Sequence, residues 1–189
     1  DSDFAYEVMV YINRKIAEFN EEDHILYAIY GTPAESLCGL QVKQFRAKYG
    51  VVKGVSDRAY VSNSFHCHVT EDISPVQKQD KEKRFWNLFN GGKIQYVRYP
   101  LDYNKEAIRS LVNRAMEIGF YEGVNLDLCY CNSCGYSAVE MNGTCPKCGS
   151  HEITQVDRMN GYLGITRNAD GSSRYNDAKL AEIAERRSM

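Results

Sequence analysis

The chain has 189 residues, enough for one domain with a small appendage, and it is 43% hydrophobic and 12% aromatic, so it can bury a core and is not disordered. The formal net charge is −2 with both signs interspersed, which provides no field for binding nucleic acid or an anionic membrane. The sequence contains neither an apolar run of membrane-spanning length nor a signal-peptide pattern, and we expect a cytoplasmic protein.

The first third of the chain alternates between predicted helices and predicted strands. Apolar residues recur at helical spacing over residues 3–20, and the short apolar run at 24–30 predicts a buried strand. Helical spacing returns at residues 34–48, which Gly50 closes, and residues 60–69 are β-like. The chain has no initiator methionine, so we expect a C-terminal fragment of a larger protein.

The remaining elements continue this alternation. Ser74 and Pro75 predict the N-cap and the first position of a charged helix that reaches about residue 90. Further predicted elements are a strand at 93–99, a helix from Asn104 to Gly119, a strand at 124–129 and a final helix at 176–187. Strands that alternate with helices indicate an α/β sheet or a segment of an α/β barrel.

Four of the seven cysteines form two Cys-x-x-Cys pairs, Cys131 with Cys134 and Cys145 with Cys148, and a glycine follows each pair. Two such turns present four thiolates to one tetrahedral ion, which is typical of a structural Zn²⁺ site in a reducing compartment. Iron with four thiolates is the alternative metal. Four protein ligands leave no open coordination position, so we predict no Lewis-acid role.

A zinc ribbon on its own is most often a nucleic-acid-binding or protein-binding module. The segment 130–154 contains one basic residue, Lys147, and two acidic residues, Glu140 and Glu152. It therefore lacks the cluster of basic side chains that binds the phosphates of nucleic acid. We therefore expect the metal to hold the segment that follows it, because metal binding supplies folding energy to a stretch with little core of its own.

Shortly after the knuckle the chain reads Arg158-Met-Asn-Gly161-Tyr-Leu-Gly164. Glycine carries no side chain on its Cα, so a radical there can lie flat between the neighbouring amides. The Arg-x-x-Gly-Tyr motif beside a four-cysteine knuckle resembles the C-terminal segment of the anaerobic (class III) ribonucleotide reductases. Pyruvate formate-lyase-type enzymes share a related glycine motif but lack the knuckle.

This resemblance implies a ten-stranded α/β barrel of the glycyl-radical type. Residues 1–128 would form the C-terminal portion of the barrel, 129–152 the zinc knuckle, and 153–189 the glycyl-radical loop and terminal helix. The resemblance also implies that a radical-SAM activase with an iron–sulfur cluster installs the radical on Gly161 by means of S-adenosylmethionine. Leu163 and Ile165 would shield the radical and Arg158 would anchor its loop.

The implied enzyme is an oxidoreductase that removes the 2′-hydroxyl of ribonucleoside triphosphates for DNA synthesis. A thiyl radical on a cysteine upstream of this chain would begin the reaction, and formate or a dithiol system would supply the electrons. The remainder of the reductase chain is an implied partner, in a homodimer, and we expect the fragment to be inactive alone.

Two segments resemble substrate-binding parts of the same family. The first segment is Tyr30–Ser36. A helix start would explain it, because Thr32 and Glu35 have capping-box spacing around Pro33, but free N–H groups at a helix start also bind phosphate. The second segment, Ser62–His68, resembles an Asn-Ser-x-His strand of the family barrel. The resemblance implies substrate contacts from Tyr30, Thr32, Ala34, Glu35, Ser36, Asn63 and Ser64.

Three other side chains suggest chemistry but have simpler explanations. His66 and His68 flank Cys67, yet in a strand the two histidines share one face and the cysteine points to the other, so we predict packing roles. Cys38 is expected to lie in the core. Cys129 is expected to be an unligated cysteine at a strand end, and the alternative is a shifted pairing in which it binds the metal.

Two further functions stay open from the sequence. The chain could be a stand-alone glycyl-radical subunit that replaces an oxygen-damaged domain in a larger partner, although the substrate-like loop disfavours this. It could also be a non-catalytic zinc-ribbon binding module, which a salt-dependent affinity for nucleic acid would support.

Overall fold

The computed structural model describes residues 2–31, 37–62, 64–98, 104–125, 128–139, 141–159 and 162–186. The helices are α1 (Ser2–Asp23), α2 (Leu37–Tyr49), α3 (Pro75–Trp86), α4 (Lys105–Ile118) and α5 (Asp177–Glu185). The strands are β1 (Gln95–Arg98), β2 (Glu122–Asn125), β3 (Leu128–Cys131), β4 (Ser137–Ala138), β5 (Ile153–Met159) and β6 (Tyr162–Arg167).

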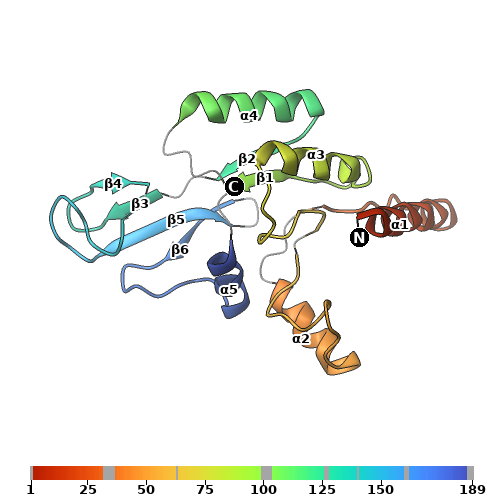
Figure 1. Ribbon diagram of the computed structural model, residues 1–189, viewed down its shortest axis with the longest axis horizontal. Helices are drawn as coiled ribbons and strands as arrows, with labels where there is room; N and C mark the ends of the chain where they lie inside the picture. Colours follow the sequence, from red (N-terminus) through yellow and green to blue (C-terminus); the bar gives the residue numbers. More distant parts are fainter. Residues whose placement is uncertain are drawn as a thin grey trace.

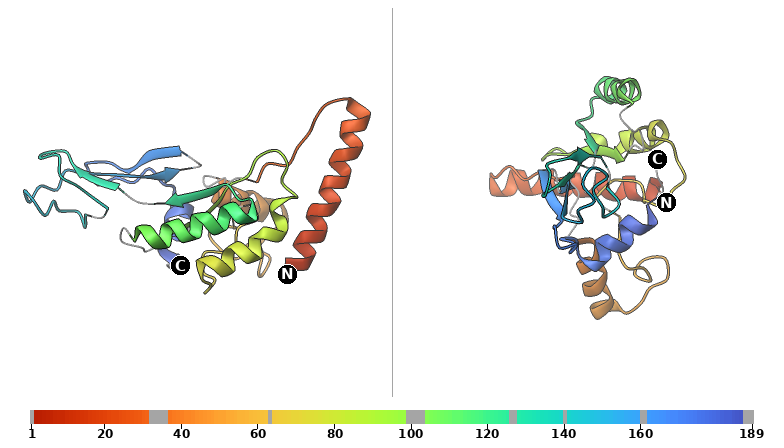
Figure 2. Two further views of the ribbon diagram at one scale, coloured as in Figure 1. Left: turned by 90° about the horizontal axis from the view of Figure 1, so that it is seen from above. Right: turned by 90° about the vertical axis from the view of Figure 1, so that its left-hand side faces the viewer.

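The elements form two sheets. β1 and β2 pair in parallel, with α3 and α4 beside them, while the other strands form an antiparallel sheet in the order β4-β3-β5-β6 (Figure 1). α5 lies between the β5–β6 hairpin and α2, and α1 extends at the opposite end of the molecule from the antiparallel sheet (Figure 2). Within the described residues, no helix is long and apolar enough to cross a membrane.

Local side-chain chemistry sets the ends of the helices where the sequence predicts them. Ser74 and Gln77 form a reciprocal capping box at the start of α3. Asn104 Oδ1 accepts the Ala107 N–H at the start of α4, and Gly119 ends that helix with a left-handed φ of 89°. Asn176 caps α5 in the same way, so these predicted helix starts are confirmed.

Two of the predicted strands are wrong. Residues 24–30 contain no strand, because side chains bind their backbone: Asn20 Oδ1 accepts the Tyr27 N–H (2.6 Å) and Asn90 Oδ1 accepts the Ile29 N–H (3.0 Å). The backbone of this segment pairs only briefly with residues 91–93: the Gly91 N–H donates to Ile29 O (2.8 Å), and Gly31 forms an isolated parallel bridge with Lys93. The described residues of 60–69 form turns instead of a strand.

A third predicted strand, at 124–129, is divided between the two sheets. β2 ends at Asn125 in the parallel pair, and β3 begins at Leu128 in the antiparallel sheet. The strand expected at 93–99 is present as β1, in register Gln95 with Glu122. The order of strand, helix and strand from β1 through α4 to β2 confirms the α/β character of this region.

Aromatic contacts in the core join α3, the end of α4 and the turn at residues 64–68. Trp86 packs on Phe120 with ring centroids 4.6 Å apart, and Ala115 of α4 is fully buried against them. Phe65 completes this cluster through contacts with Trp86 (5.9 Å) and Phe89 (4.9 Å). The core therefore attaches the 64–68 turn to the helices beside the parallel strands.

Candidate functional site

The four paired cysteines lie in two turns with the same hydrogen-bond pattern. In the first turn the Gly135 N–H donates to Cys131 O (2.9 Å) and the Cys131 N–H to Tyr136 O (2.8 Å). In the second the Gly149 N–H donates to Cys145 O (2.9 Å) and the Cys145 N–H to Ser150 O (2.8 Å).

Both glycines that follow the cysteine pairs have a left-handed backbone. Gly135 has a φ of 71° and Gly149 a φ of 75°, a conformation that other residues rarely adopt. Each turn can therefore fold back over its own pair of thiols.

The two turns bring all four sulfur atoms together. The Sγ atoms of Cys131 and Cys148 are 3.6 Å apart, those of Cys134 and Cys145 are 3.7 Å apart, and all four lie within 4.8 Å of one another. A tetrahedral ion with Zn–S bonds of about 2.3 Å requires sulfur separations of about 3.8 Å. The donor set therefore fits Zn²⁺, and among the described residues it is the only group of three or more potential ligands.

The electrostatics of Cys131 favour the thiolate that a metal requires. Burial opposes ionisation, but the backbone N–H groups of Cys134 and Ser133 and the neighbouring thiols lower the pKa of Cys131 to about 6. Cys129 lies outside this cluster, since its Sγ contacts Val139 O at 3.7 Å, as expected for the unligated cysteine.

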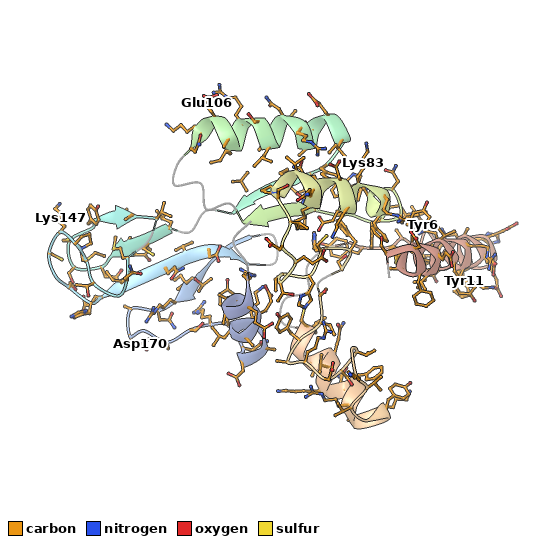
Figure 3. The ribbon with its side chains drawn as sticks, in the orientation of Figure 1. Tyr6, Tyr11, Lys83, Glu106, Lys147 and Asp170 are labelled. Carbon is orange, nitrogen blue, oxygen red and sulfur yellow. The ribbon has the colours of Figure 1, made fainter. Side chains whose placement is uncertain are left out.

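The knuckle is joined directly to the hairpin that follows it. Cys131 pairs with Ile153, the first residue of β5, and β5 pairs in turn with β6. Asn132 reinforces this junction, because its Nδ2 donates to Thr154 Oγ1 at 3.0 Å. Figure 3 shows Lys147 at the outer end of the knuckle, away from α1 and α4.

Gly161 lies outside the described residues. Met159 at the end of β5 pairs with Tyr162 at the start of β6, so the glycine stands between two paired strands in the sequence. The sequence motif predicts only a loop here, whereas the structure has a strand on each side of it. The Asn160-Gly161 dipeptide between strand-forming residues is a recognised hairpin signal and could have revealed them.

Polar side chains contribute to the packing of the hairpin. Asp157 and Thr166 are buried, and Tyr175 Oη lies 3.3 Å from Asp157 Oδ2. α5 in turn packs closely on α2, where a Cβ added to Gly39 would lie 2.2 Å from the Cβ of Ala178. α5 thus packs on α2, and Tyr175, two residues before α5, contacts β5.

The structure describes two of the predicted substrate residues. Tyr30 is 67% exposed, and Ser64 has an unusual left-handed φ of 48°. The other five, Thr32, Ala34, Glu35, Ser36 and Asn63, lie outside the described residues.

The two predicted substrate segments are neighbours through the aromatic core. A Cβ on Gly31, the residue that precedes Thr32, would lie 2.6 Å from the Phe89 ring. Phe89 also contacts Phe65, which follows Ser64. The described ends of both segments therefore converge on one aromatic side chain.

The histidines around Cys67 have separate environments, because this segment is a turn and not a strand. His66 Nδ1 is 3.4 Å from the buried Glu82 carboxylate, while the His68 ring stacks on Tyr60 at 5.6 Å. Glu82 is not among the site residues that the sequence predicts. Its only sequence signal is a lysine four residues earlier, which is common on exposed helices.

Comparison with solved structures defines the class of fold. The chain is similar to an anaerobic ribonucleotide reductase with a TM-score of 0.78 and 17% identity, covering 100% of this chain and 29% of that one. A Thermotoga maritima anaerobic ribonucleotide reductase in complex with dATP and CTP gives a TM-score of 0.68 and 18% identity, over 87% of this chain and 26% of that one.

Sequence comparison identifies the family. The profile of the anaerobic ribonucleoside-triphosphate reductases matches residues 1–188, and the chain belongs to this family. The Escherichia coli K12 anaerobic ribonucleoside-triphosphate reductase is 32% identical over 183 residues (93% of this chain, 25% of that protein). The phage T4 protein of that name is 33% identical over 171 residues (86% and 28%). The chain thus spans about a quarter of its curated relatives.

Proposed function

We propose that this chain forms the C-terminal part of an anaerobic reductase that converts ribonucleoside triphosphates to deoxyribonucleotides for DNA synthesis. The family match over residues 1–188 is the observation that carries the proposal. The four-thiolate cluster that leads directly into the β5–β6 hairpin supports it further. The enzyme belongs in the cytoplasm of an organism that grows without oxygen.

Within this enzyme, Cys131, Cys134, Cys145 and Cys148 hold a structural Zn²⁺ ion. The ion supplies folding energy and has no free coordination position for a substrate. The backbone pairing of β3 with β5 carries the order of the knuckle into the hairpin. The role of the cysteines is therefore to fix the position of the segment that contains Gly161.

Gly161 is the radical site. A radical-SAM activase with an iron–sulfur cluster removes a hydrogen atom from its Cα by means of S-adenosylmethionine. The stored radical then generates a thiyl radical on a cysteine in the remainder of the reductase chain. Leu163 and Ile165 exclude oxygen and water from the site, and Arg158 anchors it.

The substrate lies between the two convergent segments. Tyr30, Thr32, Ala34, Glu35 and Ser36 contact the nucleotide from the loop before α2, and Asn63 and Ser64 contact it from the turn after residue 60. Residues 1–128 form the C-terminal portion of a ten-stranded barrel, and the whole reductase is a homodimer. The convergence of Gly31 and Phe65 on Phe89 supports this arrangement.

Anaerobic EPR spectroscopy tests the proposal. The chain, and a version extended by the upstream reductase sequence, are incubated with a cognate activase, S-adenosylmethionine and a reductant. We expect a glycyl doublet that is absent from the matched Gly161→Ala variant. A doublet from the extended version alone would keep the site and show that activation needs the upstream part. Silence from both versions would refute the radical role and favour a zinc-ribbon binding module.

A further inference from the structure

Four donors converge on one buried carboxylate in α3. The Glu82 side chain is 1% exposed, and the Cys67 N–H donates to its Oε1 at 2.8 Å. Lys78 Nζ lies 2.6 Å from the same oxygen. Gln95 Nε2 donates to Oε2 at 3.1 Å, and His66 Nδ1 lies 3.4 Å from Oε2. Glu82 therefore joins α3, the first residue of β1 and the 64–68 turn.

The charges of this cluster are balanced inside the core. Burial opposes ionisation of Glu82, but His66 and Lys78 outweigh it and lower the pKa of the carboxyl to about 2. Burial also lowers the pKa of His66, so its ring is neutral at pH 7. The carboxylate is thus a permanent acceptor whose counter-ion is Lys78.

The turn that Glu82 binds is conformationally unfavourable. Ser64 has a φ of 48°, a left-handed conformation that costs energy for a residue with a side chain and is retained where surrounding contacts enforce it. Phe65 is held by Trp86 and Phe89, and the next fixed points are His66 and the Cys67 N–H, both on Glu82. The aromatic core and Glu82 therefore hold the turn at successive positions.

A carboxylate that serves only as a salt-bridge partner would not need the Cys67 backbone. Apolar residues of similar volume often replace a buried ion pair without loss of stability. The hydrogen bond to Cys67 differs, because it orients the backbone two to three residues from Ser64. Phe65, which lies between Ser64 and this backbone in the chain, contacts Phe89, the ring that Gly31 also approaches.

We propose that Glu82 is a positioning residue. It fixes the 64–68 turn, so that Ser64 faces the substrate and keeps a constant distance from the segment around Gly31. This role rests on the proposed reductase function, in which Ser64 contacts the nucleotide. Glu82 itself touches no reacting atom; it acts through the Cys67 N–H and His66. Loss of the acceptor should release the turn, while the β5–β6 hairpin, which contributes none of the four donors, stays unchanged.

Two double variants of the full-length reductase separate positioning from stability. Lys78→Met/Glu82→Met removes both charges and the acceptor, whereas Lys78→Met/Glu82→Gln removes both charges but keeps an amide oxygen for the Cys67 N–H. Asp80→Asn on the same helix, in an exposed pair with Arg114, is the acid-to-amide control. Activity on ribonucleoside triphosphates, EPR radical yield and hydrogen exchange over residues 62–69 are measured for each.

We expect kcat/KM to fall about tenfold or more in Lys78→Met/Glu82→Met, with the radical yield within about twofold of the wild type. Amide exchange over residues 62–69 should accelerate in the same variant, and Lys78→Met/Glu82→Gln should restore most of both losses. Equal kcat/KM and equal exchange in the two double variants would overturn the proposal. A parallel loss of radical yield and of protection throughout α3 would assign Glu82 a purely structural role.

A failure of the proposed reductase function would give a different result from a failure of the role proposed for Glu82. A wild-type protein that yields neither a glycyl radical nor a deoxyribonucleotide product would refute the reductase assignment and leave no substrate for Ser64 to face. The exchange comparison would still report whether Glu82 holds the turn. A normal radical and normal turnover in every variant would refute only the role of Glu82.

Discussion

At the scale of single residues, the structure separates cysteines that could bind a metal from those that could not. Cys145 lies 3.7 Å from Cys134 within the four-sulfur cluster, whereas the buried Cys129 contacts a backbone carbonyl. Residue type and burial are the same for Cys145 and Cys129, so only the position of the sulfur distinguishes them.

Replacement of one cluster cysteine should therefore remove the metal. We expect Cys145→Ser to lower the zinc content from about one ion per chain to a small fraction, because three thiolates bind zinc far less tightly than four. Cys129→Ser is the matched control and should retain the ion. Metal analysis by mass spectrometry after gel filtration decides this, and equal zinc in both variants would contradict the assignment.

The buried Glu82 carboxyl should make stability depend on pH. Its folded-state pKa is about 2 against an ordinary value of 4.5, so the ionised group contributes stability above pH 4.5 that is lost as the pH falls toward 2. Between pH 6 and pH 4 we expect the wild type to lose about 1 kcal/mol of unfolding free energy relative to Lys78→Met/Glu82→Gln. Urea unfolding at both pH values measures this, and parallel curves would contradict it.

At the scale of elements, the sequence predicts those features that local chemistry determines. Ser74, Asn104 and Asn176 cap helices because their side chains accept the N–H three residues further on. The predictions fail where distant groups decide. Residues 24–30 and 60–69 are apolar enough for strands, but Asn90 and Glu82 bind their backbones from other elements. No local pattern reports such contacts.

The contact between α2 and α5 should depend on the absence of a side chain at Gly39. A Cβ there would lie 2.2 Å from the Cβ of Ala178, so Gly39→Ala should destabilise the chain by about 1–3 kcal/mol through overpacking. Ala178→Gly in the same chain should recover part of the loss, because it vacates that space. Urea unfolding of the two single variants and the double variant tests the coupling, and strictly additive effects would argue against a direct contact.

At the scale of the whole molecule, the exposed apolar side chains indicate surfaces that a larger assembly covers. α1 has no buried residue, and Phe4 (66% exposed), Tyr11 (52%) and Phe19 (50%) recur on it at helical spacing. Leu26, three residues after the end of this helix, is also 89% exposed. Figure 3 shows Tyr11 on α1 at the end of the molecule opposite the knuckle.

The isolated chain should therefore self-associate. Soluble monomers rarely expose apolar stripes of this kind. The chain matches 25% of the Escherichia coli relative, so the rest of that protein is about three times as long as the matched part and could cover the stripe. We expect sedimentation velocity to show concentration-dependent oligomers that Phe4→Ser/Tyr11→Ser/Phe19→Ser reduces. The matched control, Met116→Ser, removes a 68% exposed apolar side chain from α4 and should leave association unchanged. If both variants behave alike, general hydrophobicity and not the α1 stripe drives association. A chain extended by the upstream reductase sequence should associate less. If it associates equally, the added sequence does not cover this stripe.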